Sequence, residues 1–208
     1  QELVYERSIS GPMFFNGSPN DVIEGASKGR ELYFTQWLQF PLPINGKHYP
    51  SSWGERFNAW AQDNFWLRIP GLHTPERKCK IYRCTWNDDE NDGDPAECTV
   101  VADGSPHFNG ITISADRSTV FATDLPNKRL LTYQRGADGP LSPSGAIPLT
   151  HPVDNVEFDE ASGEIWMGSI PRLLECFVAA SSTHTKESWS RWKIPGGLQV
   201  ARPSADGG

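Results

Sequence analysis

The chain has 208 residues, of which 19 are Gly and 17 are Pro, and its formal net charge is -7. This acidic balance argues against a nucleic-acid partner, which requires a basic face, and no apolar run reaches the roughly 18–20 residues that a transmembrane helix needs. Frequent turn residues, eight Trp and the lack of long helix-forming runs are typical of an all-β protein with many short strands.

Three segments of the chain share one pattern, and they are residues 18–35, 107–123 and 152–169. Each begins with a polar pair that contains Asn, continues as an alternating strand, turns at Gly, Asp or Ser, and returns as a second β-rich strand. Asn109 and Asn155 are 46 residues apart, and Asn20 and Asn109 are 89 apart, close to twice that spacing. A period of this size is typical of the blades of a β-propeller.

The segments between the repeats are predicted to form outer strands and loops. Residues 36–78 break the pattern and indicate a long loop insert, with a short helix around 54–64; long loops in compact domains are often functional. Residues 136–148 are rich in Gly and Pro and are expected to form a loop that leads to the next blade. We therefore expect a partial propeller domain at 1–195 and a flexible tail at 196–208, where Gly, Pro and Ala are frequent.

Three further strands are predicted at residues 80–86, 98–104 and 129–135. The first two would form a hairpin around an acidic loop. Cys84 and Cys98 flank that loop, within disulfide reach if they face each other across the hairpin. Two partly buried thiols are the alternative.

The candidate functional residues are polar residues at the starts of the inner strands. In a propeller the innermost strand of each blade lines the central channel, so residues at this position in successive blades point at one spot on the axis. Their carbonyl and carboxylate oxygens suit Ca²⁺ better than zinc or copper. The alternative is that they make turn hydrogen bonds before a strand, but three positions in register with the repeat favour a metal site. The candidate ligands are Asn20, Asn109, Asp154 and Asn155.

A candidate catalytic residue is His107, which lies two residues before Asn109 and hence on the same face of an extended strand. As a general base it would have to lie within hydrogen-bond distance of a metal-bound water. The alternative is a structural histidine. No Gly-x-Ser-x-Gly motif is present, so a serine hydrolase is not supported.

These motifs resemble a known family. A series of motifs along the chain is similar to the motifs of the paraoxonase/arylesterase family, which is related to the gluconolactonase and senescence-marker proteins. In chain order they are Pro19-Asn20-Asp21, Phe108-Asn109-Gly110-Ile111, Val153-Asp154-Asn155 and the stretch at 163–168. The similarity covers roughly residues 14–178. It implies a six-bladed calcium-dependent β-propeller, present here in part. By that resemblance Asn20, Asn109, Asp154 and Asn155 would bind a catalytic calcium, and Asp21 would bind a second, structural calcium.

The departures from the family pattern bear on function. By that resemblance the family's remaining carboxylate ligand and its proposed catalytic histidines would belong to N-terminal blades, which we expect this chain to lack. Ile170 would stand where the family has another histidine. An open propeller would expose sheet edges, which proteins normally avoid, so we expect a missing segment or another chain to complete it.

The resemblance implies calcium-dependent hydrolysis of a small aryl ester or lactone, with the metal polarising the ester carbonyl in the central tunnel. It also favours a secreted or secretory-pathway protein. The alternative is a non-catalytic propeller, a binding or assembly subunit with a retained or degenerate calcium site.

Overall fold

A computed structural model describes residues 18–25, 31–38, 79–86, 97–105, 107–172 and 196–202. These residues form three antiparallel sheets, and in each sheet neighbouring strands follow one another in sequence. The first sheet contains β1 (Ser18–Glu24), β2 (Glu31–Leu38), β3 (Cys79–Thr85) and β4 (Glu97–Ser105). The second contains β5 (Phe108–Ile113), β6 (Thr119–Asp124), β7 (Arg129–Arg135) and β8 (Leu141–Pro148). The third contains β9 (Val153–Asp159), β10 (Glu164–Ser169) and β11 (Gly197–Ala201).

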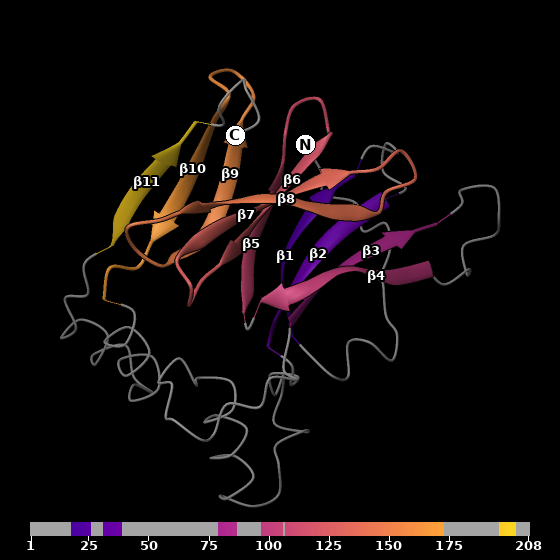
Figure 1. Cartoon of the computed structure of the whole chain (residues 1–208), viewed down its shortest axis with the longest axis horizontal. Coiled ribbons are helices and arrows are strands. Elements are labelled where there is room, and N and C mark those ends of the chain that lie inside the picture. The colour runs from indigo at the N-terminus through magenta and orange to yellow at the C-terminus, as the bar shows by residue number, and fades with distance from the viewer. Residues whose placement is uncertain are drawn as a thin grey trace, which may run out of the picture.

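The three sheets meet along their first strands. Strand β5 contacts β1 on one side and β9 on the other, and Figure 1 shows the remaining strands of each sheet following outward from this centre. Up-and-down sheets that share an inner edge are the blades of a β-propeller. The prediction of an all-β, partial propeller is therefore confirmed.

The sheets pack on one another through alternating side chains of their strands. In β6, Val120 and Ala122 belong to the core between the first and second sheets, whereas Phe121 belongs to the core between the second and third. Successive side chains of a strand point to opposite faces, so one short strand contributes to both cores. The middle sheet is covered on both faces, which explains why β5 and β6 are buried almost throughout.

Two segments differ from the sequence prediction. Residues 141–148 form the outer strand β8, paired along its length with β7, and not a loop. Its proline residues are tolerated because an edge strand needs only part of its N–H groups for pairing. Residues 197–201, expected within the flexible tail, form β11 and pair with β10. Most of the predicted insert (39–78), including the expected helix at 54–64, lies outside the described residues.

The predicted hairpin is formed by β3 and β4, where Cys84 and Cys98 are directly opposite each other. They form a disulfide with their Cα atoms 4.1 Å apart, which decides between the two alternatives for this pair. Cys79 is buried and takes no part in a disulfide. Among the described residues, no helix is long and apolar enough to cross a membrane.

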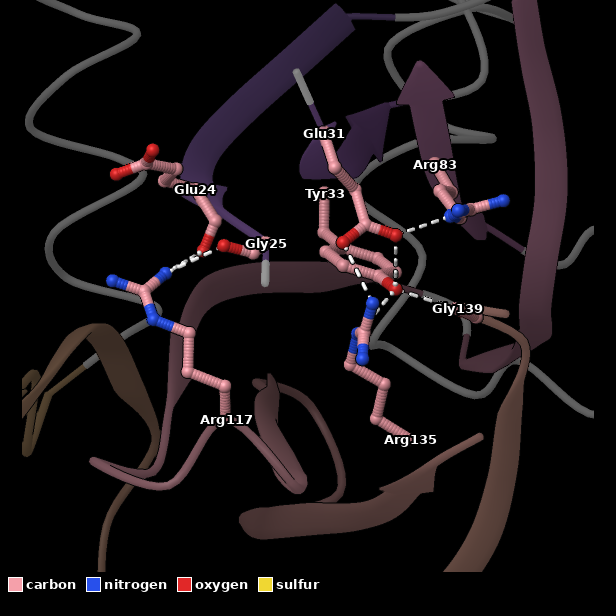
Figure 2. Close-up of polar contacts among 8 residues, drawn as sticks. All are labelled: Glu24, Gly25, Glu31, Tyr33, Arg83, Arg117, Arg135 and Gly139. Atoms are coloured by element: carbon pink, nitrogen blue, oxygen red, sulfur yellow. Dashed lines mark hydrogen bonds and ion pairs between the residues drawn. The ribbon is translucent and has the colours of Figure 1, made fainter. Parts of the chain in front are cut away.

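A buried ionic network fixes the junction between the first and second sheets (Figure 2). The fully buried carboxylate of Glu31 in β2 pairs with Arg83 in β3 and with Arg135 in β7, the latter at 2.8 Å. The hydroxyl of Tyr33 donates to the carbonyl of Gly139 at 2.7 Å, across the same junction. Burial on its own raises the pKa of Glu31, but the hydrogen bonds from Arg83 and Arg135 outweigh it and hold the pKa below its usual value.

Arg117 makes a second tie between these sheets, also drawn in Figure 2. Its guanidinium donates to the backbone carbonyls of Glu24 and Gly25, each at 2.7 Å. Both carbonyls lie at the end of β1, whereas Arg117 lies in the turn between β5 and β6. The two sheets are thus joined by charged groups at this end as well as by their apolar core.

Candidate functional site

The candidate site lies at a β-bulge that recurs in the inner strand of each sheet. In β5 the register slips between Phe108 and Ile111, so Asn109 and Gly110 are opposite the single residue Thr123. A bulge bends its strand and redirects its side chains. The same slip recurs in the other inner strands, with Asn20 and Asp21 opposite Thr35, and Asp154 and Asn155 opposite Gly168.

This register defines which residues of the three repeats are equivalent. Asn20, Asn109 and Asp154 occupy the first position of the bulge, and Asp21, Gly110 and Asn155 occupy the second. The sequence spacing had grouped Asn155 with Asn20 and Asn109. The strand pairing instead gives Asp154 the place that Asn holds in the other two sheets.

Asn109 and Asp154 are in direct contact. The side chain of Asn109 is almost completely buried and hydrogen-bonds the carboxylate of Asp154. Burial raises the pKa of Asp154, the hydrogen bond from Asn109 opposes this, and the negative charge of Asp21 raises the pKa further. Side chains from β1, β5 and β9 therefore act on one another at this point.

Asp21 links the first two inner strands. One oxygen of its carboxylate, Oδ2, accepts the backbone N–H of Ile111 in β5 at 2.9 Å. The other, Oδ1, accepts the N–H of the next residue, Val22, at 2.9 Å. The carboxylate is thus held in place by the backbone, with its charge directed toward the second sheet.

Two threonine residues support the site, and sequence reasoning did not identify them. Thr35 in β2 donates its hydroxyl proton to the carbonyl of Asn109, and Thr123 in β6 donates to the carbonyl of Asp154 at 3.2 Å. The two contacts are equivalent, since each runs from the second strand of one sheet to the bulge of the next. The signal in the sequence was the Thr shared by Phe34-Thr35 and Ala122-Thr123 at the same place in the first two repeats.

Gly110 allows the backbones of β5 and β9 to meet. A Cβ atom on Gly110 would lie 2.7 Å from the carbonyl oxygen of Asp154 and 2.7 Å from the amide nitrogen of Val156. Both neighbours are backbone atoms, which cannot rotate away. Glycine is therefore required here by close approach of the chain.

The other predicted residues are placed differently. Asn155 is exposed, next to the half-buried Asp154, and Asn20 lies in β1, with its side chain outside the described part of the structure. His107 is buried immediately before β5. Its backbone N–H donates to the hydroxyl of Ser105 at 3.1 Å, and its carbonyl accepts the N–H of Leu125 at 3.4 Å.

The chemistry of the donor set fits a calcium ion. Asp21 and Asp154 bring two carboxylates close enough for one charge to affect the other, and bound cations would relieve this repulsion. Asn109 adds an amide oxygen, which is a hard ligand of the kind that calcium prefers. In the described part of the chain no group of three or more His, Cys, Asp or Glu could hold a metal. A metal at these bulges would therefore depend on amide or backbone oxygens as well as on carboxylates.

The strand order and the recurring polar bulges together define the described residues as blades of a β-propeller. Residues 93–190 match the family model named Arylesterase, and this confirms the resemblance to the paraoxonase/arylesterase family over that region. Human serum paraoxonase/arylesterase 1 is 32% identical over 83 residues, which cover 40% of this chain and 23% of that protein. Mouse serum paraoxonase/lactonase 3 is 33% identical over 84 residues, 40% of this chain and 24% of that protein. The match thus spans about a quarter of the length of these relatives.

Solved structures show weaker similarity. A hypothetical selenium-binding protein from Sulfolobus tokodaii aligns with a TM-score of 0.41 and 7% identity over 67% of this chain and 30% of its own. A structure described as a 6-phosphogluconolactonase from Bacteroides uniformis aligns with a TM-score of 0.37 and 9% identity over 78% of this chain and 51% of its own. Scores this low do not establish a shared fold, so the propeller assignment rests on the strand order and the contacts of the inner strands.

Proposed function

We propose that this chain forms part of a calcium-dependent hydrolase of aryl esters or lactones. The observation that carries the proposal is the contact between Asn109 and Asp154 beside the charge of Asp21. It brings oxygen ligands of three consecutive inner strands to one place. Two of these strands, β5 and β9, lie within residues 93–190, which match the Arylesterase family.

In this proposal Asn109 and Asp154 would hold the catalytic calcium, together with Asn20 and Asn155, and Asp21 would hold a structural one. When bound, the ion would polarise the ester carbonyl and stabilise the negative charge that develops on its oxygen. Thr35 and Thr123 position the site by fixing the backbone carbonyls of Asn109 and Asp154. His107 is the candidate base that would remove a proton from the attacking water.

A non-catalytic propeller is the second candidate, and two observations favour it. Both carboxylate oxygens of Asp21 already accept backbone N–H groups, as in a purely structural role. Ile170 stands where the family pattern has a histidine, and its apolar side chain cannot donate or accept a proton. A binding or assembly subunit could keep this framework without turnover.

Calcium titration by calorimetry, followed by hydrolysis assays on phenyl acetate and a simple lactone, separates the two candidates. We expect calcium binding that Asn109→Ala and Asp154→Ala weaken, with calcium-dependent turnover lost in both. Glu160→Gln, an exposed carboxylate in the β9–β10 turn, is the control that should retain both properties. Binding without turnover would support the non-catalytic candidate, and a chain that binds no calcium would contradict the metal site itself.

A further inference from the structure

The carboxylate of Asp124, the last residue of β6, is fully buried, although Asp124 is not one of the candidate calcium ligands. Its oxygen Oδ1 accepts the hydroxyl of Ser105 at 3.0 Å and the side-chain amide of Asn127 at 3.0 Å. Its oxygen Oδ2 accepts the same amide at 3.0 Å and pairs with the guanidinium of Arg129. A charge is buried at low cost only where it is paired and hydrogen-bonded, and this one has both kinds of partner.

These partners come from two different parts of the fold. Asn127 lies in the turn after β6 and Arg129 begins β7, so both are close to Asp124 in the sequence. Ser105 instead ends β4 of the first sheet, where it pairs with Cys79 of β3. A single hydroxyl group therefore joins the end of the first sheet to a buried charge of the second.

The same hydroxyl group holds the segment that leads into β5. The oxygen of Ser105 accepts the backbone N–H of His107 at 3.1 Å, and the carbonyl of His107 accepts the N–H of Leu125 at 3.4 Å. The next residue, Phe108, pairs directly with Asp124. The link between β4 and β5 is thus fixed to the end of β6 immediately before the bulge.

The third sheet shows why the second sheet needs this hydroxyl group. There Pro152 occupies the place of His107, and its carbonyl accepts the N–H of Ile170 at 2.9 Å in the equivalent contact. Proline has no N–H group, whereas the N–H of the buried His107 requires an acceptor. Ser105 provides that acceptor, and because its proton is donated to Asp124 its lone pairs are left for His107.

The bulge that carries Asn109 is therefore fixed on both sides. Before the bulge, Ser105 holds the chain at the end of the first sheet. After it, the N–H of Ile111 donates to Asp21 of the first sheet at 2.9 Å. Asn109 itself hydrogen-bonds Asp154 of the third sheet. Since this one residue has to meet groups from both neighbouring sheets, a small shift of its segment would separate them.

We propose that Asp124, acting through the hydroxyl group of Ser105, is a positioning residue for Asn109 in the calcium site. The inference rests on the proposed function, since it takes Asn109 to be a calcium ligand. Removing a group that orients a metal ligand typically lowers metal affinity by about 10- to 100-fold. Asn127 and Arg129 bind the same carboxylate from the side of β7, so they support the β6–β7 turn and not the start of β5.

Calcium affinity, measured by calorimetry on the whole chain, tests this role. We expect Ser105→Ala to weaken calcium binding by about 10-fold or more, because Asp124 then loses its link to β5. Asn127→Ala is the matched control: it removes hydrogen bonds from the same carboxylate on the side of the turn, and it should bind calcium as the parent chain does. Asp124→Ala should also weaken binding, and in the double variant with Ser105→Ala the two losses should not add, since both residues act through one set of contacts.

Amide hydrogen exchange in EDTA, followed by mass spectrometry, gives a second readout that needs no calcium. Ser105→Ala should speed exchange in β5, whereas Asn127→Ala should speed it in the turn at 125–128 and leave β5 as in the parent chain. Unchanged exchange in β5 of Ser105→Ala would overturn the positioning role, whether or not the chain binds calcium. Equal losses of calcium affinity in Ser105→Ala and Asn127→Ala would also overturn it, because they would reflect a general loss of stability. A parent chain that binds no calcium would instead contradict the proposed function, and the exchange result would still decide whether Asp124 positions β5.

Discussion

Gly110 and Asp154 meet through their backbones, since a Cβ atom on Gly110 would lie 2.7 Å from the carbonyl oxygen of Asp154. Gly110→Ala should therefore push β9 away from β5 and separate the side chains of Asn109 and Asp154. We expect a loss of about 2 kcal/mol or more in the free energy of unfolding, measured from urea denaturation, together with weaker calcium binding. Gly168→Ala is the matched control, because no atom lies within 4 Å of its Cβ position. Equal effects of the two substitutions would contradict this account.

Asp154→Asn should have opposite effects on stability with and without calcium. The raised pKa of Asp154 means that the folded protein binds a proton more tightly than the unfolded chain. The associated stability is present below the unfolded value of about 3.8 and is lost as the pH rises through the folded pKa. In EDTA at neutral pH, Asp154→Asn should thus melt at or above the temperature of the parent chain, and the difference should disappear toward acid. With calcium the parent chain should become more stable than Asp154→Asn, because an ion that binds only the folded state stabilises that state.

Asp159→Asn is the control for that experiment. Hydrogen bonds from Ser162 and from the backbone of Ala161 hold the pKa of Asp159 below its usual value, so this carboxylate stabilises the fold when it is ionised. Its replacement should lower the melting temperature at neutral pH, regardless of calcium. If both aspartate variants shifted in the same direction in EDTA, the burial argument for Asp154 would be wrong.

Glu31→Gln should be strongly destabilising. It removes the charge that compensates Arg83 and Arg135 at a fully buried position, and breaking a buried ion pair from one side costs about 3 kcal/mol or more. Because the pKa of Glu31 is lowered, its stabilisation is present above the unfolded value of about 4.5 and is lost as the pH falls through the folded pKa. The free energy of unfolding of the variant should therefore not show this loss as the pH falls. Glu164→Gln, which affects the exposed pair with Arg202, should cost under about 1 kcal/mol.

Reduction of the Cys84–Cys98 disulfide should cost about 3 kcal/mol, the value for a closed loop of roughly 15 residues; the two cysteines are 14 positions apart. The parent chain in reductant should then have the stability of the double variant Cys84→Ala/Cys98→Ala. Reductant should leave the double variant unchanged, since Cys79 takes no part in a disulfide. A parent chain insensitive to reductant would show that the bond does not contribute.

The repeat and the metal-site hypothesis could be read from the sequence because both depend on local patterns. Alternating residues predicted the strands, and the spacing of Asn20, Asn109 and Asn155 predicted that the inner strands are equivalent. The assignment of Asp154 to the first bulge position required the pairing of β9 with β10, because one residue of register moves every side chain to the other face.

Other features depend on contacts between distant positions. Glu31 meets partners 52 and 104 residues away, and no local pattern indicates which charges will meet. The need for glycine at position 110 appears only once β9 is placed against it. Strand β8 was missed because its Gly and Pro content resembles a loop, although an edge strand tolerates both.

The threonine hydrogen bonds at the bulges affect how the sheets separate when the protein unfolds. Thr35 and Thr123 each tie their sheet to the next one, but the equivalent position in the third sheet is Gly168, which has no hydroxyl group. A sheet packed beyond the third would therefore be held there without that hydrogen bond. On heating we expect the three described sheets, which the hydrogen bonds of Thr35 and Thr123 join, to unfold together as one cooperative unit.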